Sequence, residues 1–282
     1  MFLVRYKSLI GLSLALIAAV GFGAGITETM AADAAIVEQA PEPPFDNKRF
    51  DKEPPGRNWS LILGGGGIYE PEYEGSEDFK VSPVPFVIFT YGDWLEIDPR
   101  GVTINAFERN GFSVAGTVGY EMGRKADDHA MLSGLGDIDA AATLGGKLAY
   151  EIGPMEFYGT ITQTLSGSES LIGTIGAAYS APITEKLILE AGAEAVIAND
   201  KHMQAYFGVN AAQSAASGLA QYTPGSGVKR VDFSVSATYL VTENWMIRAG
   251  GGVGILTGDA VDSPIVKEKV QPSASLFVGY KF

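Results

Sequence analysis

The feature that most constrains the fold of this chain is a strict alternation of apolar and polar residues over long stretches. In residues 112–122 and 231–239 apolar side chains take nearly every second position, and small, polar or charged residues fill the others. A strand turns such a pattern into one apolar and one polar face, whereas a helix would scatter it around its axis. The pattern recurs from Trp59 to Phe282 and therefore predicts an all-β protein.

The length of the alternating segments indicates which kind of β protein this is. Strands of globular sheets usually have ~5–6 residues, whereas crossing a bilayer takes ~9–11 residues. Most of the segments here are of the longer kind, and their polar faces of Ser, Thr and Gly suit a wet lumen. Aromatic residues near the segment ends are typical of girdles at the lipid interfaces. We predict a transmembrane antiparallel β-barrel.

We expect about twelve strands, with ten or fourteen as alternatives, because bacterial single-chain barrels have an even number and both ends face the periplasm. The least secure pair is 92–98 with 101–108. Residues 203–209 are assigned to a long loop, because a thirteenth strand would break the parity. The expected strands span 59–69, 79–91, 92–98, 101–108, 111–122, 137–152, 155–166, 170–181, 185–198, 229–241, 244–256 and 271–282. The longer loops, 70–78, 123–136, 199–228 and 257–270, then all fall at the outer end.

The N-terminal region has a different composition. Residues 1–32 place Arg5 and Lys7 before a short apolar stretch and then small residues, which predicts a cleaved secretory signal peptide. Residues 33–57 are rich in proline and charge and lack periodicity, so we expect a flexible periplasmic segment before the barrel at 58–282. The predicted location is the outer membrane of a Gram-negative cell.

Charge and cysteine content exclude some functions. The formal net charge is -13, which argues against a nucleic-acid partner, since such partners need basic contacts to phosphates. The chain has 0 Cys, which excludes disulfides and thiolate chemistry. We expect no cofactor and no metal.

Two regions carry a family resemblance. The stretch "YEPEYEGSEDFKVSPVPFV" holds a motif formed by Pro71, Tyr73, Gly75 and Ser76, and the C-terminal third includes "YTPGSGVKRVDFSVSATYLVTENW" and the closing "GYKF". Together they resemble the MipA/OmpV family of outer-membrane proteins. The resemblance implies an outer-membrane barrel without established catalytic residues. One branch of the family is described as a scaffold between a murein-degrading lytic transglycosylase and a murein-synthesising penicillin-binding protein; other members are surface antigens or adhesins.

The leading functional prediction is therefore a non-enzymatic scaffold for murein-remodelling proteins, and the alternatives are a small-solute pore or a surface adhesin. Expected partners are outer-membrane lipid and lipopolysaccharide, the outer-membrane assembly machinery, and a murein hydrolase and synthase. A terminal strand that alternates and ends on an aromatic residue resembles the signal that the assembly machinery reads. Its residues are Leu276, Val278, Tyr280 and Phe282. The charges expected in the lumen are Asp139, Lys147, Glu190, Glu194, Asp232 and Arg248, as an ionic network or a pore lining.

Catalytic and metal sites have weak signals. His129 and His202 lie in predicted outer loops, and without a Gly-x-Ser-x-Gly elbow we interpret both as solvated loop histidines. The acidic group Glu70, Glu72, Glu74, Glu77 and Asp78 matches no calcium-loop spacing and is interpreted as a solvated loop. Cation-bridged contact with lipopolysaccharide or a catalytic carboxylate pair are its alternatives. Residues 210–227 favour a short helix ended by Gly218.

Overall fold

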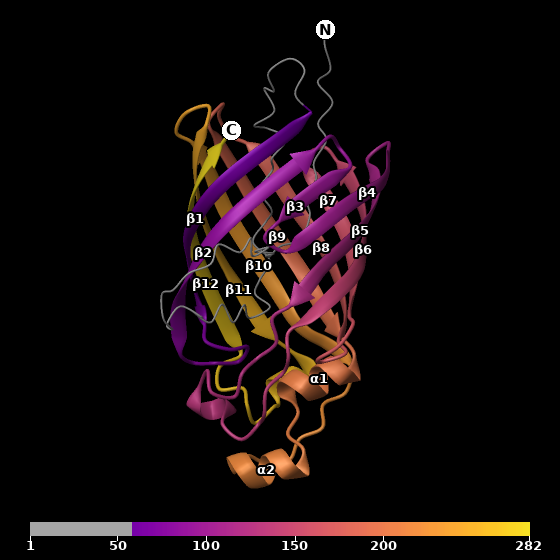
Figure 1. Ribbon diagram of the computed structural model, residues 1–282, viewed down its shortest axis with the longest axis vertical. Coiled ribbons are helices and arrows are strands. Elements are labelled where there is room, and N and C mark those ends of the chain that lie inside the picture. The colour runs from indigo at the N-terminus through magenta and orange to yellow at the C-terminus, as the bar shows by residue number, and fades with distance from the viewer. Residues whose placement is uncertain (1–57) are drawn as a thin grey trace, which may run out of the picture.

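The computed structural model describes residues 58–282, which form a twelve-stranded antiparallel sheet closed into a barrel (Figure 1). The predicted barrel and its twelve strands are confirmed. The strands are β1 (Trp59–Pro71), β2 (Phe79–Tyr91), β3 (Leu95–Asp98), β4 (Gly101–Arg109), β5 (Phe112–Glu121), β6 (Ala141–Ile152), β7 (Met155–Thr164), β8 (Leu171–Pro182), β9 (Leu187–Ala198), β10 (Gly227–Leu240), β11 (Trp245–Leu256) and β12 (Val270–Lys281). The predicted signal peptide and the segment 33–57 lie outside the described residues.

Every strand pairs with its neighbours in sequence, and β12 closes the barrel by pairing with β1. The closing register runs from Ile62 opposite Lys281 to Tyr69 opposite Ala274. This pairing explains why the last strand alternates so regularly: its backbone is bonded on both sides and only its outer face is exposed.

The two ends of the barrel differ. At the end where β1 begins and β12 finishes, which we call the terminal end, the strands are joined by short turns such as 110–111 and 153–154. At the opposite end, the loop end, the connections 72–78, 122–140, 199–226 and 257–269 are much longer. Figure 1 shows the helices of these loops gathered at the loop end. The predicted asymmetry of turns and loops is confirmed.

The outer face of the barrel is apolar. Outward side chains such as Leu148, Ile175 and Val235 are more than half exposed, while inward positions on the same strands hold Lys147, Thr174 and Ser236. A water-soluble protein would bury the first group, so the sheet has the inside-out arrangement that a lipid environment requires.

Exposed aromatic side chains collect at the terminal end. Trp94, Tyr150, Tyr179, Trp245 and Phe282 are between about two-fifths and half exposed and lie where strands meet the short turns. The loop end has a smaller group, in which Tyr69 stacks on Phe79 with ring centroids 5.0 Å apart. The girdle is therefore developed mainly at one interface, where amphipathic rings suit the lipid headgroups.

An apolar cluster interrupts the polar interior. Ile62, Phe86, Ile88, Met246 and Phe277 are buried on the inner faces of β1, β2, β11 and β12, beside the closing pair of strands. The rings of Phe86 and Phe277 meet edge to face at 5.7 Å. They lie directly against the backbone of β1, because a Cβ at Gly64 would come within 2.3 Å of the Phe86 ring. The glycines of β1 make room for this packing.

Short helices occupy the loops. These are η2 (Ala130–Leu132), α1 (Asp200–Phe207), α2 (Ala211–Ser217) and α3 (Gly258–Val261). The predicted helix ended by Gly218 is confirmed by α2, whose C-cap is Gly218 at φ 77°. Residues 203–209 are not a strand, and most of them belong to α1. None of the helices in residues 58–282 has the length and apolar character of a membrane-spanning helix.

Candidate functional site at the loop end

The main polar site begins with an irregularity in β10. Val228 lies opposite Ile197 and Arg230 opposite Val196, so Lys229 is an extra residue in a β-bulge. The bulge turns two consecutive cationic side chains toward the interior, where the exposed fractions of Lys229 and Arg230 are 0% and 2%. Regular alternation would have placed one of them on the lipid face.

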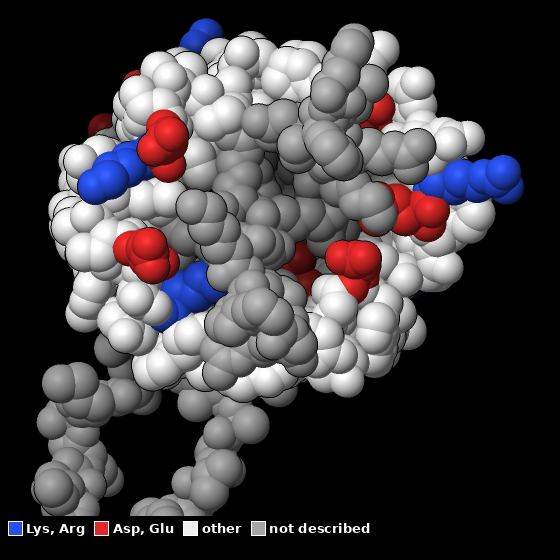
Figure 2. Space-filling view, turned by 90° about the horizontal axis from the view of Figure 1, so that it is seen from above, with Lys and Arg blue, Asp and Glu red and all other residues white. Residues whose placement is uncertain are grey.

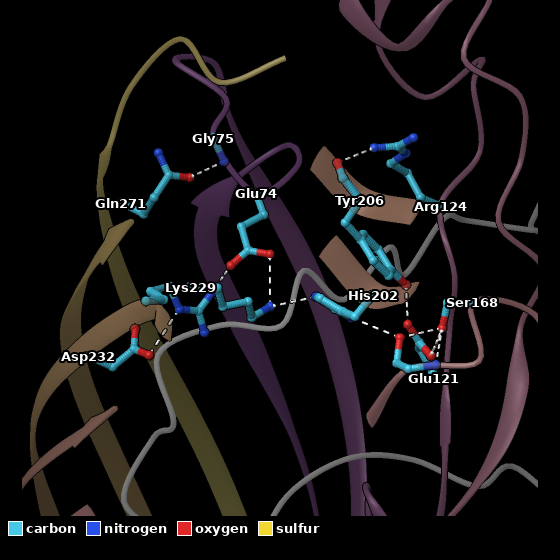
Figure 3. A network of polar contacts seen from close by, with 12 residues as sticks. Glu74, Gly75, Glu121, Arg124, Ser168, His202, Tyr206, Lys229, Asp232 and Gln271 are labelled. Atoms are coloured by element: carbon cyan, nitrogen blue, oxygen red, sulfur yellow. Dashed lines mark hydrogen bonds and ion pairs between the residues drawn. The ribbon is translucent and has the colours of Figure 1, made fainter. Parts of the chain in front are cut away.

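A single carboxylate from the loop between β1 and β2 joins the two cations. Glu74 Oε2 accepts from Lys229 Nζ at 3.1 Å, and Glu74 Oε1 accepts from Arg230 Nη1 at 3.0 Å. Arg230 Nε also donates to Asp232 Oδ2 at 2.9 Å. Figure 3 shows Glu74 between β10 and the helix α1. The low dielectric around buried charges makes these contacts strong and makes the loss of one partner costly.

The family-motif loop is fixed by contacts to the loop between β11 and β12 and to the start of β12. Tyr73 donates its hydroxyl proton to Ile265 O at 3.1 Å, and the backbone N–H of Gly75 donates to Gln271 Oε1 at 3.0 Å. Gly75 has φ 96°, and a Cβ there would lie 2.6 Å from Val266 Cγ2. Pro71, at the end of β1, and Ser76 in the loop are also buried. The motif residues therefore position Glu74 and are not themselves exposed.

The helix α1 adds a buried histidine to the site. Asn199 caps the helix by accepting from His202 N–H at 2.9 Å. His202 Nε2 lies 3.1 Å from Lys229 Nζ, and its Nδ1 lies 2.8 Å from Ser170 Oγ. The ammonium of Lys229 can only donate, so Nε2 is the acceptor and the proton of the neutral ring is on Nδ1. The interpretation of His202 as a solvated loop histidine is wrong, since it is 2% exposed.

A second carboxylate holds the other side of α1. Glu121 of β5 accepts from Ser168 Oγ at 2.8 Å and from the hydroxyl of Tyr206. Arg124 Nη1 donates to Tyr206 O at 3.0 Å, and burial lowers the pKa of this guanidinium. Figure 3 shows these groups continuing the network from His202 toward β5. The network therefore ties the α1 loop across the mouth of the barrel.

This arrangement does not fit nucleophilic catalysis. A serine nucleophile needs a histidine nitrogen that accepts its proton, but Nδ1 of His202 donates toward Ser170. Both residues are only 2% exposed, so a substrate could not reach either side chain. The network is built to fix loops and to neutralise buried charge.

The other predicted histidine is at the surface of the same end. His129 Nε2 lies 3.1 Å from Asp78 Oδ2 and 3.7 Å from Glu72 Oε2. Its Nδ1 accepts from Met131 N–H at 3.0 Å and so caps η2. His129 therefore joins the acidic loop to the loop that follows β5.

The acidic loop is only partly solvated. Glu77 and Asp78 are exposed and Glu72 is half-buried, but Glu70 and Glu74 are 2% and 9% exposed. The prediction of a solvated loop is wrong for these last two, because Ser82 donates to Glu70 at 2.9 Å and two cations neutralise Glu74. Within residues 58–282 no group of acidic and histidine side chains has the geometry of a metal site.

The remaining predicted charges lie along the interior of the barrel. Lys147 forms an ion pair with Glu156 at 2.6 Å, Arg248 with Glu190, and Tyr158 donates to Glu194 at 2.5 Å. Asp232 belongs to the network at Arg230. The expectation that Asp139 lies in the lumen is wrong: it is exposed in the loop before β6, which begins at Ala141, four residues later than the predicted start at residue 137.

The C-terminal residues lie as the alternation requires. Leu276, Val278 and Phe282 are 55%, 41% and 50% exposed on the outer face, and Tyr280 packs its ring against Trp245 and Phe282. Phe277, between them, points inward to the apolar cluster. Recognition of this strand by the assembly machinery stays a prediction.

Comparisons with known proteins add a family and a set of similar barrels. The family model described as "MltA-interacting protein MipA" matches residues 63–282. No curated protein is significantly similar to the chain.

The solved structures that resemble the chain are outer-membrane barrels. The NanC porin has a TM-score of 0.44 at 10% identity, covering 79% of this chain and 100% of its own. OmpT of Vibrio cholerae has a TM-score of 0.36 at 11% identity, covering 79% and 97%. The translocator domain of the autotransporter NalP from Neisseria meningitidis has a TM-score of 0.39 at 12% identity, covering 84% and 92%. At these identities the likeness concerns the fold alone.

Proposed function

The chain belongs to the MipA family, and we propose that it is a non-enzymatic outer-membrane anchor that holds murein-remodelling enzymes at the inner surface of the membrane. The observation that carries the proposal is the family match over residues 63–282, whose description names an interaction with MltA. The expected partners are a lytic transglycosylase and a penicillin-binding protein.

The interior of the barrel supports an anchor over a pore. The lumenal charges Lys147, Glu190 and Arg248 are 8%, 6% and 1% exposed and are bonded to partners on the next strand or the next but one. A conducting lumen would keep such groups hydrated. The loop network over α1 adds a second layer of fixed polar groups at the mouth.

The terminal end supplies a surface for a periplasmic partner, because short turns face the periplasm in barrels of this kind. Figure 2 looks onto this end and shows acidic and basic side chains spaced around its rim. Its turns carry the exposed residues Asp93, Glu185, Lys186 and Glu243. Rim charges of this type govern encounter and orientation more than affinity.

The test is capture of murein enzymes by the purified protein. The full-length protein and a variant lacking residues 33–57 would be immobilised in detergent and exposed to a periplasmic and membrane extract. Recovery of a lytic transglycosylase or a penicillin-binding protein supports the anchor, and its loss without 33–57 assigns the contact to that segment.

A matched pair of charge reversals locates the contact on the barrel. We expect Glu243→Lys, at the terminal end, to reduce recovery, and Asp127→Lys, in the loop after β5, to leave it unchanged. If neither the full-length protein nor the variant lacking 33–57 retains a murein enzyme, the anchor is wrong and bilayer conductance becomes the deciding measurement.

A further inference from the structure

His202 is a buried titratable group in the middle of a row of hydrogen bonds at the mouth of the barrel. Its Nε2 accepts from Lys229 Nζ, and its Nδ1 lies 2.8 Å from Ser170 Oγ. Ser170 Oγ is hydrogen-bonded to Ser168 Oγ, which donates to Glu121 Oε2 at 2.8 Å. Figure 3 shows this row running from β10 past α1 toward β5. The row joins a cation at one end to a carboxylate at the other.

All donors in this row point the same way. Lys229 has only protons to offer, so the proton of the neutral ring is on Nδ1 of His202 and is donated to Ser170. Ser168 gives its hydroxyl proton to Glu121, so it accepts from the hydroxyl of Ser170. Each group therefore has the role that its neighbour requires as long as His202 is neutral.

Protonation of His202 would reverse one of these contacts. An imidazolium carries an N–H at both nitrogens, so Nε2 would direct a proton at the ammonium of Lys229, 3.1 Å away. Lys229 is 0% exposed, and a buried site screens two like charges poorly. His202 lies on a loop helix, whereas Lys229 belongs to a strand of the barrel wall. Separation of the two charges therefore requires α1 to move.

The groups nearest this contact do not offset the repulsion. Glu74, from the loop before β2, is already shared by Lys229 and Arg230, so a protonated His202 would be a third cation at one carboxylate. The ring of Tyr206 stacks on that of His202 with centroids 4.5 Å apart, and its hydroxyl donates to Glu121.

The remaining charged groups around α1 are engaged elsewhere. Arg124 lies 6.0 Å from the ring centroid of Tyr206 and adds positive charge on that side. Asp259 of α3 accepts from the backbone N–H of Gly225 at 2.7 Å. Asp200 is exposed at the start of the helix, and Lys201 forms an exposed ion pair with the carboxylate of Glu169.

Apolar contacts hold α1 from the other side. Met203 and Phe207 are both 0% exposed and pack in a cluster with Leu256 and Ala260. Ser263 Oγ donates to Phe207 O at 2.6 Å. None of these groups titrates between pH 5 and pH 7. The position of α1 is therefore set by a constant apolar attraction and by a polar contact that depends on one histidine.

We infer that α1 is an acid-sensitive latch over the mouth of the barrel, closed while His202 is neutral and opened when His202 takes up a proton. An ordinary histidine titrates at about pH 6.5, and above this value the closed state is favoured to its full extent. Each pH unit below it favours the open state about tenfold further, because the open state binds a proton that the closed state excludes. The inference does not depend on the anchor function.

The experiment is hydrogen–deuterium exchange of the full-length protein in detergent micelles at pH 7 and pH 5, corrected for the intrinsic pH dependence of amide exchange. We expect the protection of residues 200–207 to fall by about thirtyfold at pH 5 and to recover at pH 7. The protection of residues 231–239 in β10 should stay constant. Protection of α1 that does not change, or that falls only together with the strands, would refute the latch.

Two variants identify the responsible groups. His202→Gln keeps an acceptor for Lys229 and a donor for Ser170 but cannot take up a proton, so α1 should stay protected at pH 5. Lys229→Met removes the opposing cation, and the pH dependence should again disappear. A transition of wild-type size in either variant contradicts the inference. If His202→Gln leaves α1 unprotected even at pH 7, the result for Lys229→Met decides.

His129 supplies the matched control, because its surroundings have the opposite charge. Its Nε2 lies 3.1 Å from Asp78 Oδ2 and 3.7 Å from Glu72 Oε2, so a proton on this ring adds attraction between the loops. His129→Gln should therefore leave the opening of α1 in acid unchanged. Loss of the transition in His129→Gln, with its persistence in His202→Gln, would assign it to the wrong histidine and overturn the inference.

Discussion

Glu74→Gln should destabilise the barrel strongly, because it removes the charge that neutralises Lys229 and Arg230. Removing one partner of a buried ion pair typically costs ~3–5 kcal/mol. In the variant Arg230 still has its ion pair with Asp232, and Lys229 still has its hydrogen bond with His202. We therefore expect a loss of unfolding free energy at the lower end of this range, about 3 kcal/mol. Glu77→Gln, in the same loop but exposed, should change stability by less than about 0.5 kcal/mol.

The assay is guanidinium unfolding of the protein in lipid or detergent, followed by tryptophan fluorescence. A double-mutant cycle with Lys229→Met isolates the pair, and contacting charges of this kind should show a coupling of about 1–3 kcal/mol. A cost for Glu74→Gln below about 1 kcal/mol, or a coupling below about 0.5 kcal/mol, would refute the inference that this carboxylate holds the two cations.

Three further outcomes are expected. Gly75→Ala should reduce the unfolding free energy by more than about 1 kcal/mol, because the φ of Gly75 is 96° and the new Cβ would collide with Val266. Gly218→Ala should cost less, because Gly218 also has a positive φ but no atom lies near its Cβ position. Guanidinium unfolding measures both variants. Burial raises the pKa of Tyr73 to about 12, so the folded state keeps a proton that the unfolded chain loses above about pH 10. The unfolding free energy should therefore fall between pH 10 and pH 12, and it should fall more steeply in the wild type than in Tyr73→Phe. Unfolding curves recorded at each pH measure this difference. Planar bilayers with wild-type protein should show no stepwise conductance, because Arg248 and its lumenal neighbours are buried and bonded; steps whose size changes in Arg248→Glu would favour a pore.

The strands could be predicted from sequence because their alternation is local. A lipid-facing position such as Val235 and an inward position such as Ser236 differ in polarity, and a period of two assigns both without any knowledge of partners. The alternation also predicts the short strand β3, although the predicted start at residue 92 includes the turn before Leu95.

The site could not be predicted because its contacts are long-range. Glu74 and Lys229 are 155 positions apart, and nothing in either neighbourhood shows that one loop folds over the other. The β-bulge at Lys229 also cannot be recognised from the sequence, because a regular strand could contain the same two consecutive basic residues. The one available signal was the motif of Tyr73 and Gly75, which marked the loop without showing that Glu74 is buried.

The pairing of β1 with β12 also sets the order in which this protein can fold. Ile62 and Lys281 are joined across nearly the whole described sequence, so the final contact has the largest loop-closure cost and forms slowly. Until it forms, both strands present unpaired backbone and apolar faces that invite aggregation. The sheet cannot close before β12 has paired with β1, which makes the time before closure the period in which the chain is most prone to aggregation.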